Sequence, residues 1–187
     1  MRVIGVDPGL GRTGVAVVDG GPGALRLVHA SRLDTVPQTA ETARLVSLFD
    51  LVDAVVQAHR PEVAAVEQLF FSTNRRTAMR VAEARGVILL ALARNGVTVR
   101  EYTPGEVKQA VCGYGGARKA QVMRMTMQLL QLDSSSDDVA DACAVAVCHH
   151  HRARLASLTA STIRDHASAL DAAVARARAR LQTAGSR

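Results

Sequence analysis

The first nineteen residues, MRVIGVDPGLGRTGVAVVD, constrain the fold more than any other stretch of this chain. Two apolar runs, 3–6 and 15–18, flank a segment rich in Pro and Gly, which predicts two antiparallel strands joined by a turn. Asp7 ends the first strand, where a carboxylate must be solvated, paired or bound to a metal, because burying it alone is costly. We interpret the glycines of this segment as residues that tight-turn geometry requires: Gly9, Gly11 and Gly14.

The composition favours one α/β domain with a modest extension. The chain has 187 residues, of which 48% are hydrophobic and only 3% aromatic, so aliphatic strands packed by Ala-rich helices should form the core. The sequence shows neither a long apolar run nor a signal-peptide pattern, so we expect a cytoplasmic protein that does not bind membranes. Three cysteines without CxxC spacing predict buried, reduced thiols rather than disulfides or a zinc site.

The pattern after residue 24 predicts three further strands and several helices. A third strand over 25–33 should complete an antiparallel meander, and a helix over 39–59 should lead into a short parallel strand over 63–66. Further predicted elements are a helix over 75–95, a strand over 97–102 and helices that begin near 103, 120 and 134. We therefore predict an α/β fold in which helices flank a five-stranded mixed sheet.

Glu67 follows the predicted parallel strand as Asp7 follows the first strand. Neighbouring parallel strand ends share one edge of a sheet, so we expect the two carboxylates to lie close together. The helix near 134 carries Asp138 and Asp141, three residues apart and hence on one face of its first turns. Capping of the helix is the alternative explanation for these two acids.

Four converging carboxylates cannot all stay ionised without a compensating charge. Either some of them are protonated, or hard divalent cations occupy the site. Carboxylate ligands favour Mg²⁺, and two such ions roughly 4 Å apart can activate a water and stabilise the leaving oxygen of a phosphodiester.

The charge distribution points to a polyanion as the substrate. The formal net charge of +6 is concentrated in segment 73–124, which carries 10 basic and 3 acidic residues, whereas segment 125–151 carries 4 acidic and no basic residues. A basic segment beside acidic ones suits nucleic acid held near a cation-dependent site. A solvated basic helical face would explain the middle segment alone.

Several side chains between 69 and 119 are candidates for contact with nucleic acid. Two of the three Phe residues stand in the predicted loop after Glu67, where one could stack on a base or both could pack under the next helix. Arg75 and Arg76 follow this loop. The two lysines of the chain, Lys108 and Lys119, suit phosphate as point charges, with Arg118 adjacent, although chance retention of the lysines is an equal alternative.

The C-terminal part reads as a basic extension of the catalytic unit. We place the domain over 1–152 and predict that 153–187 is mobile or partly helical, with a break at 159–164 and a helix over 165–181. The tract His149 to His151 should lie in the last turn of the preceding helix, where cations complement the helix dipole, so we do not expect it to bind a metal.

Four segments together resemble a known family. VIGVDPGLGRTGVAVV, VEQLFFSTN, VKQAVCGYGGARKAQV and DDVADACAVAVCH are similar, in residue and spacing, to RuvC-type crossover junction endodeoxyribonucleases, the bacterial Holliday junction resolvases. The resemblance covers about residues 2–150. It implies an RNase H-like fold and an enzyme that resolves Holliday junctions in recombination and DNA repair by paired symmetric nicks, through metal-activated attack of water on a phosphodiester.

Carried over by position, the resemblance also assigns roles to residues and partners. It implies that Asp7, Glu67, Asp138 and Asp141 bind the catalytic metals, two Mg²⁺ per site for which Mn²⁺ can substitute. Phe70 would stack on a base near the cut, and the two lysines would contact the backbone. It further implies a homodimer formed through residues 75–95, four-way junction DNA as substrate, and cooperation with the RuvA and RuvB branch-migration proteins.

Three other readings compete with this resemblance. A YqgF-type RNA-processing nuclease shares the opening motif but lacks the Phe-bearing loop and the basic middle segment. An actin-like phosphotransferase needs a second related domain, for which this chain has no room. A non-catalytic junction-binding protein would keep the basic segment but has no reason to keep four aligned acids.

Overall fold

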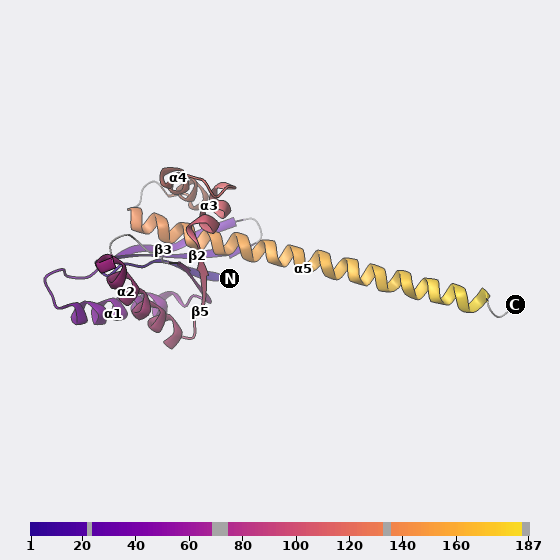
Figure 1. Ribbon diagram of the computed structural model, residues 1–187, viewed down its shortest axis with the longest axis horizontal. Coiled ribbons are helices and arrows are strands. Elements are labelled where there is room, and N and C mark those ends of the chain that lie inside the picture. The colour runs from indigo at the N-terminus through magenta and orange to yellow at the C-terminus, as the bar shows by residue number, and fades with distance from the viewer. Residues whose placement is uncertain (22–23, 69–74, 133–135, 185–187) are drawn as a thin grey trace. The chain divides into compact units, whose positions relative to one another are not determined.

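The computed structural model describes residues 1–21, 24–68, 75–132 and 136–184 (Figure 1). The chain divides into two compact units, residues 1–150 and residues 151–187. The first unit holds the whole sheet and all four predicted acids. None of the described helices is both long and apolar enough to cross a membrane.

The first unit is built on one five-stranded mixed sheet, as predicted. The strand order is β3-β2-β1-β4-β5, in which β1 pairs antiparallel with β2 and parallel with β4. The meander formed by β1, β2 and β3 and the parallel addition of β4 and β5 both match the expectation from sequence. The strands are β1 (Arg2–Asp7), β2 (Arg12–Gly21), β3 (Ala24–Asp34), β4 (Val63–Glu67) and β5 (Thr98–Tyr102).

Helices cover both faces of the sheet and enclose two apolar cores. Side chains alternate between the faces of β1, so Ile4 packs with the core under α1 and α2, whereas Val3 packs with the core under α3, α4 and α5. Figure 1 shows these two helical layers on opposite sides of the strands. The helices are α1 (Glu41–His59), α2 (Arg75–Arg94), α3 (Pro104–Cys112), α4 (Lys119–Leu130) and α5 (Asp137–Ala184).

Local signals correctly predicted the start of α3. The Thr103 side chain accepts a hydrogen bond from the Glu106 backbone N–H at 3.2 Å, and the Glu106 carboxylate accepts one from the Thr103 backbone N–H at 2.9 Å. Pro104 occupies the first turn, where a missing N–H costs nothing. This capping box sets the position of the helix that carries Lys108.

Gly14 has a role other than the predicted one, and Gly5 shares this role. Gly9 does serve the turn, because a Cβ there would overlap the Arg12 carbonyl oxygen. Gly14, however, is a residue of β2, and a Cβ on it would overlap the Asp138 carbonyl oxygen. A Cβ on Gly5 of β1 would likewise overlap the Ala142 carbonyl oxygen. These two glycines therefore let the first turns of α5 pack directly against β1 and β2, and the tight-turn interpretation is wrong for Gly14.

The predicted break at 159–164 is also wrong, because α5 is one helix from Asp137 to Ala184. The segment reads TASTIR and contains neither Gly nor Pro, and its Ser and Thr residues lower helix stability by only about a few tenths of a kcal/mol each. The His tract consequently lies inside the helix rather than in its last turn. His149 and His150 are buried and make side-chain hydrogen bonds, to Tyr102 and to the Val18 carbonyl respectively.

Candidate active site

Two carboxylates stand at one edge of the sheet because two parallel strands end there. Val6 of β1 and Val66 of β4 are paired residues in the parallel register, so Asp7 and Glu67 come next on neighbouring strands. Residues 3–6 of β1 and 64–66 of β4 carry no polar side chain and are buried, whereas Asp7 and Glu67 are half-buried. The sheet thus brings together the two acids that the sequence predicted to meet.

The other two acids arrive on the first turns of α5. Asp138 and Asp141 lie one turn apart, and the contact between the Asp138 backbone and Gly14 holds this end of the helix against β2. Gly14 pairs with Asp7 across the antiparallel ladder, so the same contact sets Asp138 beside the end of β1. All four predicted acids therefore gather at one edge of the sheet.

The pKa of Asp7 reflects the proximity of the other three acids. Burial raises the pKa of Asp7 from 3.8 to about 7, and the charges of Asp141, Glu67 and Asp138 contribute in that order. The pKa of Glu67 is raised as well, first by burial and then by Asp141. Each of these two carboxyls thus holds its proton more strongly than an exposed carboxyl does, and a cation in the site would favour the ionised form.

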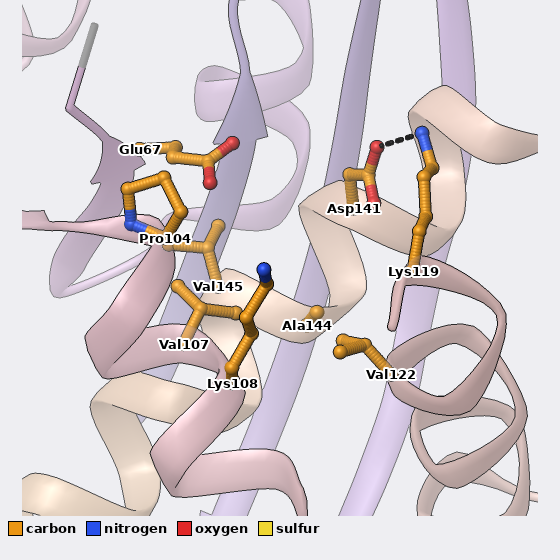
Figure 2. Close-up of a pocket in the computed structure, with 9 residues that line it drawn as sticks. All are labelled: Glu67, Pro104, Val107, Lys108, Lys119, Val122, Asp141, Ala144 and Val145. Atoms are coloured by element: carbon orange, nitrogen blue, oxygen red, sulfur yellow. Dashed lines mark hydrogen bonds and ion pairs between the residues drawn. The ribbon is translucent and has the colours of Figure 1, made fainter. Parts of the chain in front are cut away.

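Two lysines supply part of that compensation. Lys119, the first residue of α4, donates a hydrogen bond to Asp141 at 2.8 Å and lies 3.5 Å from Asp137. The charges of Lys119 and Lys108 both lower the pKa of Glu67. In Figure 2 the Lys108 ammonium points into the space between Glu67 and Asp141, while Lys119 is bonded to Asp141.

These groups line a pocket of about 260 Å³ that opens beside the acids (Figure 2). Its charged side is made of the carboxylates of Glu67 and Asp141 and the ammonium groups of Lys108 and Lys119. Its apolar side comes from α3, α4 and α5: Pro104, Val107, Val122, Ala144 and Val145. The ammonium groups suit an anionic phosphodiester by their charge, whereas the carboxylates repel it unless a cation lies between them.

The donor set fits a hard divalent cation by its chemistry, because carboxylate oxygens are the ligands such ions prefer. The carboxylates are, however, farther apart than they would be around one bound ion. Among the residues that the structure describes, no three His, Cys, Asp or Glu side chains are grouped closely enough to hold one metal ion. The ammonium of Lys119 occupies one oxygen of Asp141 in this arrangement.

The remaining predicted contacts with nucleic acid are placed only in part. Phe70 lies outside the described residues, and so do the side chains of Arg75 and Arg76 at the start of α2. Arg118 immediately precedes α4 and is exposed, and its backbone N–H donates to the Gln121 side chain at 3.0 Å. Arg118 thus immediately precedes Lys119, the residue whose ammonium contacts Asp141.

Sequence reasoning missed the bond between Lys119 and Asp141. Lys119 was expected to meet phosphate, and nothing in the spacing of residues 119 and 141 indicates a contact between them. It also missed the packing role of Gly5 and Gly14. A glycine inside an apolar strand is a recognised signal of close backbone approach, so that role could have been found.

Comparisons with known proteins agree with this architecture. The family model described as "RuvC: Crossover junction endodeoxyribonuclease RuvC" matches residues 3–149. Curated proteins of that name from Caldicellulosiruptor saccharolyticus and Chloroflexus aggregans are 41% and 46% identical over 80% and 82% of this chain, and over 92% and 94% of their own lengths.

A solved structure described as "T. thermophilus RuvC in complex with Holliday junction substrate" is also similar. It has a TM-score of 0.79 and 36% identity, with 83% of this chain and 96% of that chain covered. The five-stranded mixed sheet is accordingly that of the RNase H-like resolvases. On the strength of a family model that spans residues 3–149, this chain belongs to the RuvC family of crossover junction endodeoxyribonucleases.

Proposed function

We propose that this protein is a magnesium-dependent endonuclease that resolves Holliday junctions in recombination and DNA repair by paired symmetric nicks. The observation that carries the proposal is the convergence of Asp7, Glu67, Asp138 and Asp141 on one sheet edge beside two lysines, in a chain of this family. Carboxylates that raise one another's pKa are poised to bind a divalent cation, and the ammonium groups beside them suit the phosphate of a DNA backbone.

In this mechanism the four acids would hold Mg²⁺, two ions per site, and Mn²⁺ can take its place. When bound, the metal supplies an activated water and stabilises the charge that develops on the leaving oxygen. The chain itself orients the scissile phosphate, because Lys108 and Lys119 reach the pocket from two different helices. Ionised Asp7 and Glu67 are a condition of metal binding, since a protonated carboxyl is a poor ligand.

The DNA contacts beyond the pocket extend the same proposal. Arg118 is exposed next to Lys119, where it can reach a neighbouring phosphate. We assign backbone contacts to Arg75 and Arg76 at the start of α2, and base stacking near the cut to Phe70, by their place in the family motif. Replacement of Phe70 by Ala should slow cleavage and leave junction affinity nearly unchanged, as measured by single-turnover kinetics and a binding titration.

The partners follow from the reaction. A four-way junction has two equivalent strands to cut, and a symmetric dimer presents two equivalent sites, so we propose a homodimer formed through α2. Met79 and Leu90, both more than half exposed on that helix, are apolar side chains suited to such a contact. We further propose that the enzyme acts in the cytoplasm on chromosomal DNA, together with RuvA and RuvB.

The direct test uses a labelled synthetic four-way junction and a linear duplex of the same sequence. The full-length protein should make paired nicks confined to the junction, only when Mg²⁺ or Mn²⁺ is present, and the products should be ligatable. Binding of the junction without any cutting, under every metal condition, would instead support a non-catalytic junction-binding protein.

Two variants test the acids. Asp7→Asn and Asp141→Asn should keep junction binding, because neither removes a positive charge, and should lower cleavage by at least about a thousandfold. Circular dichroism and the melting temperature establish that each variant is folded. A variant that is folded and cuts at the normal rate would remove that acid from the mechanism.

A further inference from the structure

We propose that Lys119 is an internal counter-ion of the carboxylate site, which releases Asp141 when a divalent cation binds and then becomes available to the DNA phosphate. This inference rests on the proposed function, since it concerns how that same site is loaded. It predicts that removal of the Lys119 charge strengthens metal binding and weakens cleavage, two effects of opposite sign.

The geometry of Lys119 carries the inference. Its ammonium bonds to Asp141 at 2.8 Å and lies 3.5 Å from Asp137, and these two acids are four residues apart, on one face of α5. The bond thus engages an oxygen of a carboxylate that the metal needs. Figure 2 shows the lysine reaching this oxygen from a different helix, so its release requires no change within α5.

The solvent exposure of the pair favours exchange of the bond. The Lys119 side chain is 59% exposed and that of Asp141 is 31% exposed. An ion pair in contact with water contributes little to stability, so a cation of higher charge can compete for the carboxylate. Lys119 is the first residue of α4, and its long, flexible side chain can adopt another rotamer without a change in the helix.

Lys108 provides an internal comparison. It lines the same pocket and its charge also lowers the pKa of Glu67, yet within the described part of the chain it forms no salt bridge with any of the acids. The two lysines thus line the same pocket and both act on Glu67, but only Lys119 contacts Asp141. An effect of direct competition should therefore appear at Lys119 and be much smaller at Lys108.

The spacing of the acids agrees with this role. Within the described ranges, the acidic side chains are not grouped tightly enough to hold one ion, while Asp141 is engaged by Lys119. The Lys119 bond and metal binding by this same oxygen of Asp141 exclude each other, because one oxygen cannot contact both cations at bonding distance. Lys119 would thus neutralise the carboxylates before the metal binds and the DNA phosphate after the metal has bound.

The experiment measures metal affinity of the full-length protein without DNA, by calorimetric titration with Mn²⁺ at pH 8. The same titration at pH 9 checks that protonation of the carboxyls does not mask the comparison, since removal of Lys119 takes away a charge that lowers the pKa of Asp7. Lys119→Met should bind Mn²⁺ about tenfold more tightly than the unaltered protein, because a positive charge that lies within bonding distance of a ligand is gone. Lys119→Arg should bind as the unaltered protein does, and Lys108→Met should shift affinity by less than about threefold.

Cleavage of a four-way junction at saturating Mg²⁺ supplies the second readout. Lys119→Met should cut at least about tenfold more slowly despite its tighter metal binding, because the phosphate loses a cation. Lys119→Gln repeats both measurements with a polar side chain, so that a defect in folding of the Met variant is recognised as such. Unchanged or weaker Mn²⁺ binding by both variants would overturn the inference.

A final variant separates this inference from the proposed function. Asp141→Asn should lose Mn²⁺ affinity if the acids form the metal site. If Asp141→Asn loses affinity and the Lys119 variants gain none, the counter-ion role fails and the proposed function stands. If Asp141→Asn binds Mn²⁺ normally, Asp141 is no metal ligand, and both fail.

Discussion

At the scale of single residues, Asp7 is the group whose state depends most on the rest of the site. Burial and three neighbouring acids raise its pKa from 3.8 to about 7. A carboxyl whose folded pKa exceeds its unfolded value favours the folded state when protonated, so this stabilisation is complete below about pH 4. It is lost as the pH rises toward 7, where the ionised group must be neutralised by a cation.

The first prediction concerns the stability of Asp7→Asn. Without added metal at pH 8, the variant should have a higher melting temperature than the unaltered protein. Its free energy of unfolding should be larger by on the order of 2 kcal/mol, because a buried charge beside like charges is removed. At pH 4 the two proteins should differ by much less. Thermal melts at the two pH values measure the difference, and equal melting curves at pH 8 would contradict it.

Mn²⁺ should stabilise the unaltered protein more than it stabilises Asp7→Asn. The unaltered protein gains stability from any ligand that binds only the folded state, whereas Asp7→Asn has lost one of the proposed ligands. A melt at pH 8 with millimolar Mn²⁺ should therefore raise the melting temperature of the unaltered protein more than that of the variant. The melting temperature without metal and its rise with Mn²⁺ together distinguish the loss of a metal ligand from a general defect in folding.

His149 shows the opposite shift for a related reason. It is a buried residue of α5, and its Nδ1 is hydrogen-bonded to the hydroxyl of Tyr102 on β5 at 2.7 Å. Burial lowers its pKa to about 4, with further contributions from the charges of His150 and Arg100. The hypothesis that the His tract complements the helix dipole as a set of cations is therefore wrong for this residue, which is neutral at neutral pH.

The second prediction follows from the sign of that shift. A histidine whose folded pKa is lowered contributes stability above its ordinary pKa of 6.5, and this is lost as the pH falls toward 4. His149→Gln should consequently show a weaker decrease in free energy of unfolding between pH 7 and pH 5 than the unaltered protein does. Urea unfolding at both pH values measures it. An identical pH dependence in the two proteins would show that His149 does not titrate in this range.

At the scale of elements, the position of α5 depends on two small residues in the strands beneath it. Gly5 and Gly14 leave room for the helix backbone at Ala142 and Asp138, and any larger residue would separate helix and sheet. Because α5 carries two of the four acids, the same contact determines whether those acids meet Asp7 and Glu67. The geometry of the site is thus set partly by residues that have no functional group.

The third prediction tests this contact. Gly14→Ala should destabilise the protein by about 1–3 kcal/mol and lower cleavage at least tenfold, because the added methyl group overlaps backbone that cannot yield cheaply. Gly21→Ala is the matched control on the same strand, where a Cβ meets nothing within 4 Å. Urea unfolding and junction cleavage of both variants check the prediction; equal behaviour of the two would argue against a packing role for Gly14.

At the scale of the whole molecule, the second compact unit distinguishes this chain from the relatives compared. The two curated proteins are matched over 92% and 94% of their own lengths but over only 80% and 82% of this chain, and the family model ends at residue 149. Residues 152–187 carry 7 basic and 2 acidic side chains. We propose that this basic extension adds a non-specific electrostatic contribution to DNA binding.

The fourth prediction uses the full chain with three charges removed. Arg176→Gln, Arg178→Gln and Arg180→Gln together should weaken junction binding several-fold at low salt and reduce its dependence on salt, because fewer counterions are released. Nick positions and the rate of cutting at saturating protein should stay unchanged, since the proposed site lies in residues 1–150. Asp165→Asn with Asp171→Asn is the matched control, and it should tighten binding. An unaltered salt dependence in the Arg variant would exclude the extension from DNA contact.

The sequence by itself determined the elements and the residues that end them. Alternation of apolar residues, a capping box at Thr103 and acids at two strand ends depend on neighbours within a few positions, so their consequences can be read locally. The five-stranded mixed sheet followed, because short connections and a parallel crossover leave few alternatives.

Only the tertiary structure decided which of these residues touch. The bond from Lys119 to Asp141, the packing of Gly14 against Asp138 and the neutral state of His149 each depend on elements distant in sequence. The exposure of Val46 on α1 shows the same limit, because an apolar residue in a helical pattern does not reveal which face of the helix packs against the sheet. Close packing fixes such contacts to within an ångström, and a pattern of residue types along one chain does not carry that distance.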